Sequence, residues 1–407
     1  MLFIAKRFYK GHNNTKRGAT QPAIRVATCG IAMGLTIMLL STSVLYGFRN
    51  ELTKKISGFA AHLEILNIGT LQIPDAYPIC FPEYIEGKIK NATNVTHIQK
   101  VAQKIGVIKT GVYFKPILLK GIDETYDTTY LHEALLEGRL PTLLRDSATS
   151  EIVISKRISD ALNLQVGQRV YSYFFDDNIR MRRMTVVGIY ETNLKQFDEQ
   201  MVIADRYTVC KLNGWTNEQY SSLEVKTSSF DTINLTQADL KQLLAPYGRL
   251  TALTVDERYP QVFSWLNILN TNVWVILALM IGVAAFTLSS GLLVIMLERT
   301  PSIGILKAMG ATDKQLRSTF MTLAMLVTCK GIIWGNIIAI SIILVQYYLH
   351  PVQLDPAHYY VTEVHVVLNP LIIILINIIT LIIIFASLFI PTHIISKITP
   401  VKAIKFD

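Results

Sequence analysis

Two segments of this 407-residue chain begin like catalytic motifs, and both lack a residue that the chemistry requires. Gly106 and Gly111 have the glycine spacing of a phosphate-binding loop, but Val112 and Tyr113 stand where a lysine and a hydroxyl residue would hold phosphate and magnesium. His132–Leu136 begins like a zinc-peptidase helix but lacks the second histidine that would bind the metal. The sequence also contains no Gly-x-Ser-x-Gly elbow and no Cys-x-x-Cys pair. We therefore expect no catalytic residue, no metal and no cofactor on this chain.

Four stretches of the chain are long, apolar and nearly free of charge. A helix rises about 1.5 Å per residue, so about 20 residues cross the roughly 30 Å hydrocarbon layer of a membrane. A buried helix of a soluble core seldom needs so many successive apolar residues. We therefore predict transmembrane helices at residues 26–47, 271–297, 319–349 and 370–391.

The net charge of +9 is concentrated beside these stretches. Residues 1–25 carry six lysines and arginines and no acid, loop 298–318 has four cations against two acids, and tail 392–407 has three lysines. Loop 350–369 has no lysine or arginine. Basic loops next to membrane spans stay in the cytoplasm, so we predict cytoplasmic termini and a cytoplasmic 298–318 loop. Regions 48–270 and 350–369 then lie outside, and the charge indicates a membrane surface rather than nucleic acid.

The outer region 48–270 has the pattern of a mixed α/β domain. Glu151–Ile154 is predicted as a strand, and Ser155 suits the N-cap of a following helix. Val170–Phe175 and Met184–Tyr190 are predicted as two further strands, with a bend at 176–178 between them. The predicted fold class is therefore an α+β integral membrane protein, with this domain between its first and second membrane helices.

Two cysteines, Cys80 and Cys210, fall in the outer region. A disulfide between them is chemically allowed in that compartment. Their spacing does not show whether they lie close together, so the sequence leaves the pairing open.

Two sequence patterns bear on the first two membrane helices: one on close helix packing, and one on how far the second helix extends beyond the membrane. Gly30 and Gly34 have the small-xxx-small spacing that lets two helices approach closely. From Gln261 the helical pattern runs unbroken into the second span. A continuous helix of this kind is a stiff rod, so it could transmit movement between the outer domain and the bilayer.

The short segment between the second and third spans has the pattern of a docking helix. Ile303, Leu306 and Met309 recur at helical spacing and predict a narrow apolar face, which an ordinary turn would not need. Nearby cations could meet acidic residues of a partner, and two glycines permit close approach and an abrupt helix end. The predicted docking residues are Glu298, Arg299, Ile303, Gly304, Leu306, Lys307, Met309, Gly310 and Arg317.

Segments along nearly the whole chain match the pattern of one family. They are Phe3–Arg7, Ile31–Leu35, Tyr46–Leu52, Ile56–His62, Gly138–Pro141, Ala161–Gln168, Val186–Tyr190, Val283–Phe286, Gly304–Ala311 and Pro400–Lys405. In these segments the chain resembles the lipoprotein-releasing permeases of the LolC/LolE type, within the FtsX/MacB-like superfamily of ABC transporter membrane subunits. The segment Gly304–Ala311 is specific to the superfamily, whereas the narrower assignment rests on Gly47–His62 and Tyr359–Val361.

The resemblance implies a bacterial inner-membrane protein that extracts acylated lipoproteins. It implies that loop 298–318 docks on a separate cytoplasmic ABC ATPase dimer, which binds the ATP and magnesium. It also implies a second copy of this chain or a related permease as partner, and a periplasmic lipoprotein carrier as acceptor. The two permeases would enclose a lipid-binding cleft, for which the candidate residues here are Met33, Met38, Leu39, Val275, Leu279 and Ile281.

Three other functions stay open from the sequence. A MacB-like efflux permease for amphiphiles or peptides would share the architecture. An FtsX-like protein would transmit ATPase motion to a periplasmic hydrolase and transport nothing. A scaffold would need no docking helix. An ion pathway is disfavoured, because the spans contain almost no carboxylates.

Overall fold

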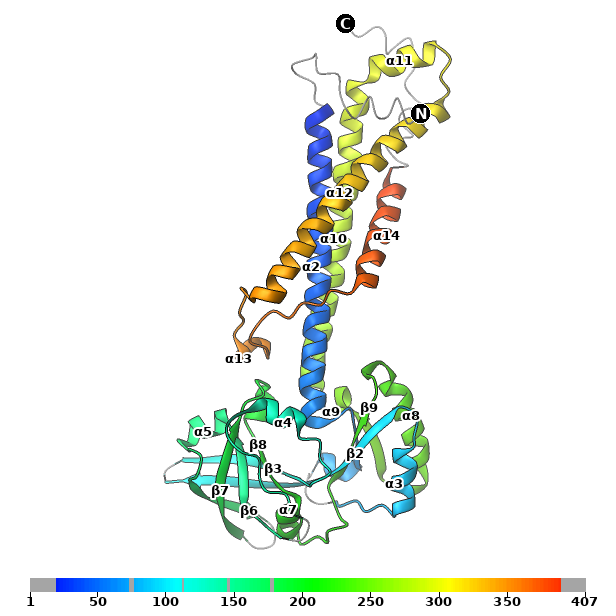
Figure 1. Ribbon diagram of the computed structural model, residues 1–407. Helices are drawn as coiled ribbons and strands as arrows, with labels where there is room; N and C mark the ends of the chain where they lie inside the picture. Colours follow the sequence, from blue (N-terminus) through cyan, green and yellow to red (C-terminus); the bar gives the residue numbers. More distant parts are fainter. Residues whose placement is uncertain (1–19, 73–76, 112, 145–146, 176–178, 389–407) are drawn as a thin grey trace. The chain divides into compact units, whose positions relative to one another are not determined.

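The chain forms two compact units (Figure 1). The helical unit comprises residues 1–49, 265–353 and 363–407, and the mixed unit comprises residues 50–264 and 354–362. Helices α2 and α10 continue across the boundary, so each contributes residues to both units. The computed structural model describes residues 20–72, 77–111, 113–144, 147–175 and 179–388.

Within this described part, four helices are long and apolar enough to cross a membrane by length and composition. They are α2 (Thr20–Ala60), α10 (Pro260–Glu298), α12 (Asp313–Leu349) and α14 (Pro370–Ser387). Helix α2 continues 13 residues beyond Gly47, where the first predicted span ends. The continuous helix predicted from Gln261 is confirmed as α10. Residues 389–391 of the fourth predicted span, the tail 392–407 and residues 1–19 of the N-terminal segment lie outside the described residues.

Glycines bring α2 against two other helices of the helical unit. A Cβ atom added at Gly30 would lie 2.9 Å from Cγ2 of Thr287 on α10, and one at Gly34 would lie 3.4 Å from the α10 backbone. On α12, a Cβ atom at Gly331 would lie 2.8 Å from Cβ of Ile31. The close approach predicted from the Gly30–Gly34 spacing is therefore confirmed, and it places α2 between α10 and α12.

A pair of asparagines joins α12 to α14. Nδ2 of Asn336 donates to Oδ1 of Asn377 at 2.8 Å, and Nδ2 of Asn377 donates back to Oδ1 of Asn336 at 3.1 Å. Each Nδ2 also donates to the carbonyl four residues earlier in its own helix, at 2.8 Å. Because polar side chains in an apolar helix bundle need partners, this reciprocal pair sets the register of α14 along α12.

One long strand runs through the sheet of the mixed unit. The strand β2 (Val95–Thr110) pairs with β9 up to Val101, with β3 from Ala102 onward, and with β6 from Gly106 to Lys109. The order is β10-β1-β9-β2-β3-β8-β5-β7-β4, with β6 beside β2 and β7. The other strands are β1 (Leu63–Asn67), β3 (Tyr113–Ile122), β4 (Leu135–Gly138), β5 (Glu151–Ser155), β6 (Arg169–Phe175), β7 (Ile179–Tyr190), β8 (Met201–Asp205), β9 (Ser222–Thr227) and β10 (Leu250–Thr254).

Helices pack among these strands. The short helices of the unit are α3 (Glu83–Lys90), α4 (Thr129–Ala134), α5 (Lys156–Leu162), α6 (Lys195–Asp198), α7 (Arg206–Asn213), α8 (Ile233–Leu244), α9 (Val255–Arg258) and α13 (Pro356–Tyr359). The predicted strands at β5, β6 and β7 are confirmed, and Oγ of Ser155 accepts from the Ile158 N–H at 3.1 Å as the N-cap of α5. The bend expected at 176–178 lies outside the described residues.

The two outer cysteines are both free. Cys210 is buried, and its Sγ donates to the Gln219 carbonyl at 3.4 Å. Cys80 is exposed. The disulfide that the sequence left open is therefore not formed.

The segment between α12 and α14 contributes to the mixed unit, whereas the sequence assigned that domain to 48–270 alone. Residues 354–362 belong to this unit, and Val361 is fully buried. Leu354 N–H donates to the Thr362 carbonyl at 2.9 Å, and Nζ of Lys55 donates to the Tyr360 carbonyl at 3.1 Å. These contacts use mainly backbone groups, so they leave no periodic pattern in the sequence.

Gly47 lies where α2 meets the backbone of residues 365–367, and we predict that it tolerates no side chain. A Cβ atom there would lie 2.0 Å from the His365 carbonyl oxygen. The nearby Ser43 hydroxyl donates to the Val367 carbonyl at 2.9 Å. We expect Gly47→Ala to destabilise the helical unit by about 1–3 kcal/mol, because overpacking forces the backbone apart. The thermal unfolding midpoint of the full-length chain in detergent measures this loss.

The matched control is Gly282→Ala on α10, where an added Cβ atom meets nothing within 4 Å. Its midpoint should stay the same or rise slightly, since alanine favours a helix over glycine. Equal thermal unfolding midpoints for the two variants would contradict the close contact at Gly47.

Candidate functional site

The loop predicted to dock on a partner forms a short helix, α11 (Thr300–Ala308), between α10 and α12 (Figure 1). The helix ends where Gly310 adopts a left-handed conformation with φ of +95°, as its position in the pattern predicts. Gly310 N–H donates to the Lys307 carbonyl at 3.0 Å. Thr312 then caps α12 in a capping box with Gln315. The sequence therefore builds a rigid helix–turn–helix rather than a loose connection.

The apolar face predicted for α11 turns partly toward the chain itself. Ile303 is fully buried among side chains of α10 and α12, and Leu306 packs against the same cluster. Ile303 is therefore not exposed to a partner, whereas Leu306 is half-buried and its docking role, like that of Met309, stays a prediction. Met309 is 73% exposed and Ile305 is 54% exposed. Periodicity finds an apolar stripe, but it does not tell whether that stripe covers the chain's own core or a partner.

The charged residues of the loop are also partly used within the chain. Nζ of Lys307 lies 2.8 Å from the Asp313 carboxylate, and its side chain is only 11% exposed. Glu298, Arg299 and Arg317 are half-buried. Gly304 is buried on the inner face of α11. The outward surface of α11 and of the turn after it thus consists mainly of Pro301, Ile305, Ala308, Met309 and Gly310, and the sequence analysis missed Ile305. Polar and charged residues, Lys314 among them, are exposed where α12 begins.

The six residues proposed for a lipid cleft separate into two groups. Met38 and Leu39 are buried in a cluster with Leu35, Ala339 and Ile376, and Ile281 packs partly against it. Met33, Val275 and Leu279 are exposed, the first by 64%. Met38 and Leu39 therefore belong to the packing of α2 against α12 and α14 and do not line an open surface. The exposed residues lie on α2 and α10.

The last turn of α2 is held by a buried ion pair in the mixed unit. Nζ of Lys120 on β3 lies 2.6 Å from Oε1 of Glu224 on β9, and both side chains are almost fully buried. The same ammonium donates to the Phe59 carbonyl at 2.7 Å and to the Tyr126 hydroxyl oxygen at 3.0 Å. Gln99 on β2 donates to Oε2 of Glu224 at 2.7 Å.

This ammonium stays charged. Burial by itself would lower the pKa of Lys120, but the Glu224 carboxylate and the Tyr126 hydroxyl outweigh it and raise that pKa above its ordinary value. The cation also lies at the C-terminal end of a helix, where unpaired carbonyls favour positive charge. The Lys120 side chain thus joins the end of α2 to β3 and, through Glu224, to β9. These two strands pair with different halves of β2.

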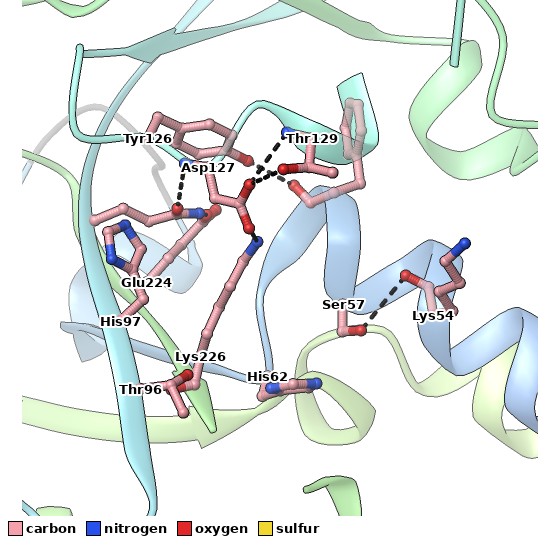
Figure 2. Close-up of polar contacts among 12 residues, drawn as sticks. Lys54, Ser57, His62, Thr96, His97, Tyr126, Asp127, Thr129, Glu224 and Lys226 are labelled. Carbon is pink, nitrogen blue, oxygen red and sulfur yellow. Dashed lines mark hydrogen bonds and ion pairs between the residues drawn. The ribbon is translucent and has the colours of Figure 1, made fainter. Parts of the chain in front are cut away.

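A second cluster of polar side chains, around Lys226 and Asp127, lies next to the Lys120–Glu224 pair (Figure 2). Lys226 on β9 forms an ion pair of 2.6 Å with Asp127, which also accepts from the N–H and hydroxyl of Thr129. His62, two residues beyond α2, accepts at Nδ1 from the Thr227 N–H at 2.9 Å. Burial, together with the Lys226 charge, lowers the pKa of His62 to about 4. His62 is therefore neutral at physiological pH.

Among the described residues, no three His, Cys, Asp or Glu side chains gather in a way that could hold a metal ion.

Comparison with known families identifies the chain. A model of the FtsX-like permease C-terminal region matches residues 274–400, and a model of the MacB-like periplasmic core domain matches residues 26–243, more than half of the chain. The chain belongs to the FtsX/MacB-like superfamily. The two matches agree with the structure of this permease. The first covers the helical C-terminal part, and the second covers the first apolar helix together with most of the mixed α/β domain.

Curated relatives narrow the family to permeases of the LolC/LolE type. The chain is 25% identical to the lipoprotein-releasing system transmembrane protein LolC of Neisseria meningitidis, over 73% of this chain and 71% of that protein. It is 19% identical to the corresponding protein LolE of Haemophilus influenzae, over 84% of this chain and 82% of the relative. Among solved structures, the periplasmic region of MacB from Actinobacillus actinomycetemcomitans is 16% identical, with a TM-score of 0.34, over 51% of this chain and 95% of that one.

The buried pair gives a prediction for the stability of the mixed unit. Lys120→Met leaves the Glu224 carboxylate buried without its cation, so we expect a loss of about 3–5 kcal/mol. The double variant Lys120→Met/Glu224→Leu should recover most of that loss, because it removes both buried charges. Urea unfolding of the mixed unit in the full-length chain, followed by pulse proteolysis, measures both. A double variant as unstable as the single one would show that the pair is not the source of the effect.

His62 gives a pH prediction. Because its folded pKa lies below the ordinary value of 6.5, the folded state binds fewer protons between pH 4 and 6.5 than the unfolded state. The contribution of neutral His62 to the free energy of unfolding is therefore complete above pH 6.5 and is lost as the pH falls toward 4. We expect a loss of about 1–2 kcal/mol between pH 7 and 4.5, after allowing for partial solvent screening.

The matched variant is His62→Asn, whose side-chain oxygen can still accept from Thr227 but does not titrate. Unfolding of wild type and variant by urea at each pH isolates the contribution of His62 from that of the carboxylates. Parallel stability curves for the two proteins would rule out a buried neutral histidine.

Proposed function

We propose that this chain is the membrane subunit of an ABC transporter that extracts acylated lipoproteins from the outer leaflet of the bacterial inner membrane for delivery toward the outer membrane. The relatives described above carry the name of a lipoprotein-releasing system and align with most of the chain. The structural observation that carries the proposal is α11. Its outward side chains are apolar, and it lies within the region that matches the FtsX-like permeases.

Extraction of a lipid anchor requires an external energy source. Each buried methylene contributes about 0.8 kcal/mol, so one acyl chain of about 15 methylenes is held by roughly 12 kcal/mol. We place the ATP and magnesium on a separate cytoplasmic ATPase dimer, with this chain as a non-catalytic permease. The exposed Ile305 and Met309 would dock on that ATPase.

The same proposal assigns orientation and partners. Both termini and loop 298–318 would lie in the cytoplasm, and the mixed unit would lie in the periplasm. A second copy of this chain or a related permease would cover the exposed residues Met33, Val275 and Leu279, and so complete a cleft for acyl chains. A periplasmic carrier would accept the lipoprotein, and membrane lipid would surround the rest of the helical unit.

Movement would pass along helices that the two units share. Helix α11 follows α10 after a single residue, Arg299. Helix α10 is unbroken from Pro260 to Glu298, so displacement of α11 by the ATPase would be carried along it into the mixed unit. Helix α2 would carry motion in the same way, with its end held by Lys120.

The test is the double variant Ile305→Asp/Met309→Asp. Both side chains are exposed in the chain itself, so the variant should fold normally but should bind the ATPase at least about tenfold more weakly. Co-purification from bacterial membranes measures the association, and mass spectrometry identifies acylated proteins that elute with the complex.

The matched control is Leu235→Asp, which changes an apolar residue of similar exposure on α8 of the mixed unit and should leave ATPase binding unchanged. Wild-type ATPase binding by the double variant would overturn the docking site. A wall hydrolase in place of acylated proteins would overturn the transport function and leave the docking site standing.

A further inference from the structure

A shallow groove of about 390 Å³ runs along α12 beside Phe385 of α14 in the helical unit. Lys314 and Arg317 line one end of it, near the start of α12. Ser318 and Thr322 follow on the same helix face. The predicted docking residues include only Arg317 of these four, so the rest of the groove has no assigned role.

The far part of the groove is apolar. Met321 and Met325 of α12 line it together with Phe385 of α14. Met325 is 50% exposed and Phe385 is 41% exposed. Met325 lies eleven residues after Lys314, which is about 16 Å along the helix axis. Along this stripe the cations lie at the start of α12 and Met325 lies at the other end, with Ser318, Met321 and Thr322 between them.

A cationic end and an apolar end, with hydroxyl groups between them, match the chemical groups of a phospholipid. A phosphate carries the negative charge, the glycerol esters accept hydrogen bonds, and the acyl chains are apolar. Lysine and arginine near a bilayer surface attract anionic headgroups, and methionine adapts its shape to a flexible chain. An acid beside the cations would weaken such a site, but the nearby Asp313 carboxylate is paired with Lys307.

We propose that this groove binds one anionic phospholipid, with the headgroup phosphate on Lys314 and Arg317 and an acyl chain along Met321, Met325 and Phe385. A zwitterionic lipid carries an ammonium that these cations repel, so the site selects for net negative charge. This lipid would lie in the cytoplasmic leaflet, a placement that rests on the orientation given under the proposed function. The binding itself depends on neither the cargo nor the ATPase.

The experiment counts lipids that stay on the full-length chain. The chain is purified in mild detergent with phosphatidylglycerol or phosphatidylcholine added at equal concentration, and native mass spectrometry measures the lipid retained. We expect Lys314→Gln and Arg317→Gln each to weaken phosphatidylglycerol binding about fivefold, with little change for phosphatidylcholine. Lys330→Gln is the matched control, because Lys330 is an exposed cation of α12 that does not line the groove.

A second variant keeps the cations and changes the groove. Met325→Trp places a larger ring where the acyl chain would lie, so it should also lower phosphatidylglycerol retention while both charges remain. Equal retention of phosphatidylglycerol by wild type and the charge variants would overturn the proposal, as would equal binding of both lipids by wild type. Loss of ATPase binding by the charge variants with unchanged lipid retention would assign these cations to a protein partner instead.

Discussion

Close contact between helix backbones is the constraint on which the helical unit depends. Helices in lipid gain little from hydrophobic burial against one another, so their association rests on dense packing and on a few polar contacts. Gly30 and Gly34 supply that density toward α10, and Gly331 and Gly335 supply it from α12 toward α2. Helix α2 is in consequence the most enclosed of the four apolar helices described. The asparagine pair between α12 and α14 adds the polar contact.

The mixed unit holds the far end of α2 by a different kind of interaction. There the carbonyls of the last helical turn need donors, and a buried ammonium provides one. Because that ammonium is neutralised by Glu224, which is itself held by Gln99, the helix end is tied to β2, β3 and β9 together. The proposed transmission of movement along α2 would need such a firm attachment at the end of a helix shared by two units.

Much of this could be predicted from local patterns. The apolar helices, the β5–α5 unit with its Ser155 cap, and the helix end at Gly310 all follow from residues close together in the sequence. What could not be predicted depends on contacts between distant residues. The burial of Ile303 depends on where α11 lies against α10 and α12, and the burial of Met38 depends on α12 and α14. Residues 354–362 join the mixed unit mainly through backbone groups, for which no residue type is diagnostic.

The ion pair between Lys307 and Asp313 has a consequence for recognition at α11. An acidic partner would have to compete with a carboxylate already 2.8 Å from the lysine, so this cation offers little net attraction. The other outward side chains of α11 and its turn, which include Ile305 and Met309, are uncharged, and the exposed Lys314 lies beyond them on α12. Association at this surface would then depend weakly on ionic strength, because counter-ions screen charges and leave apolar contacts unaffected.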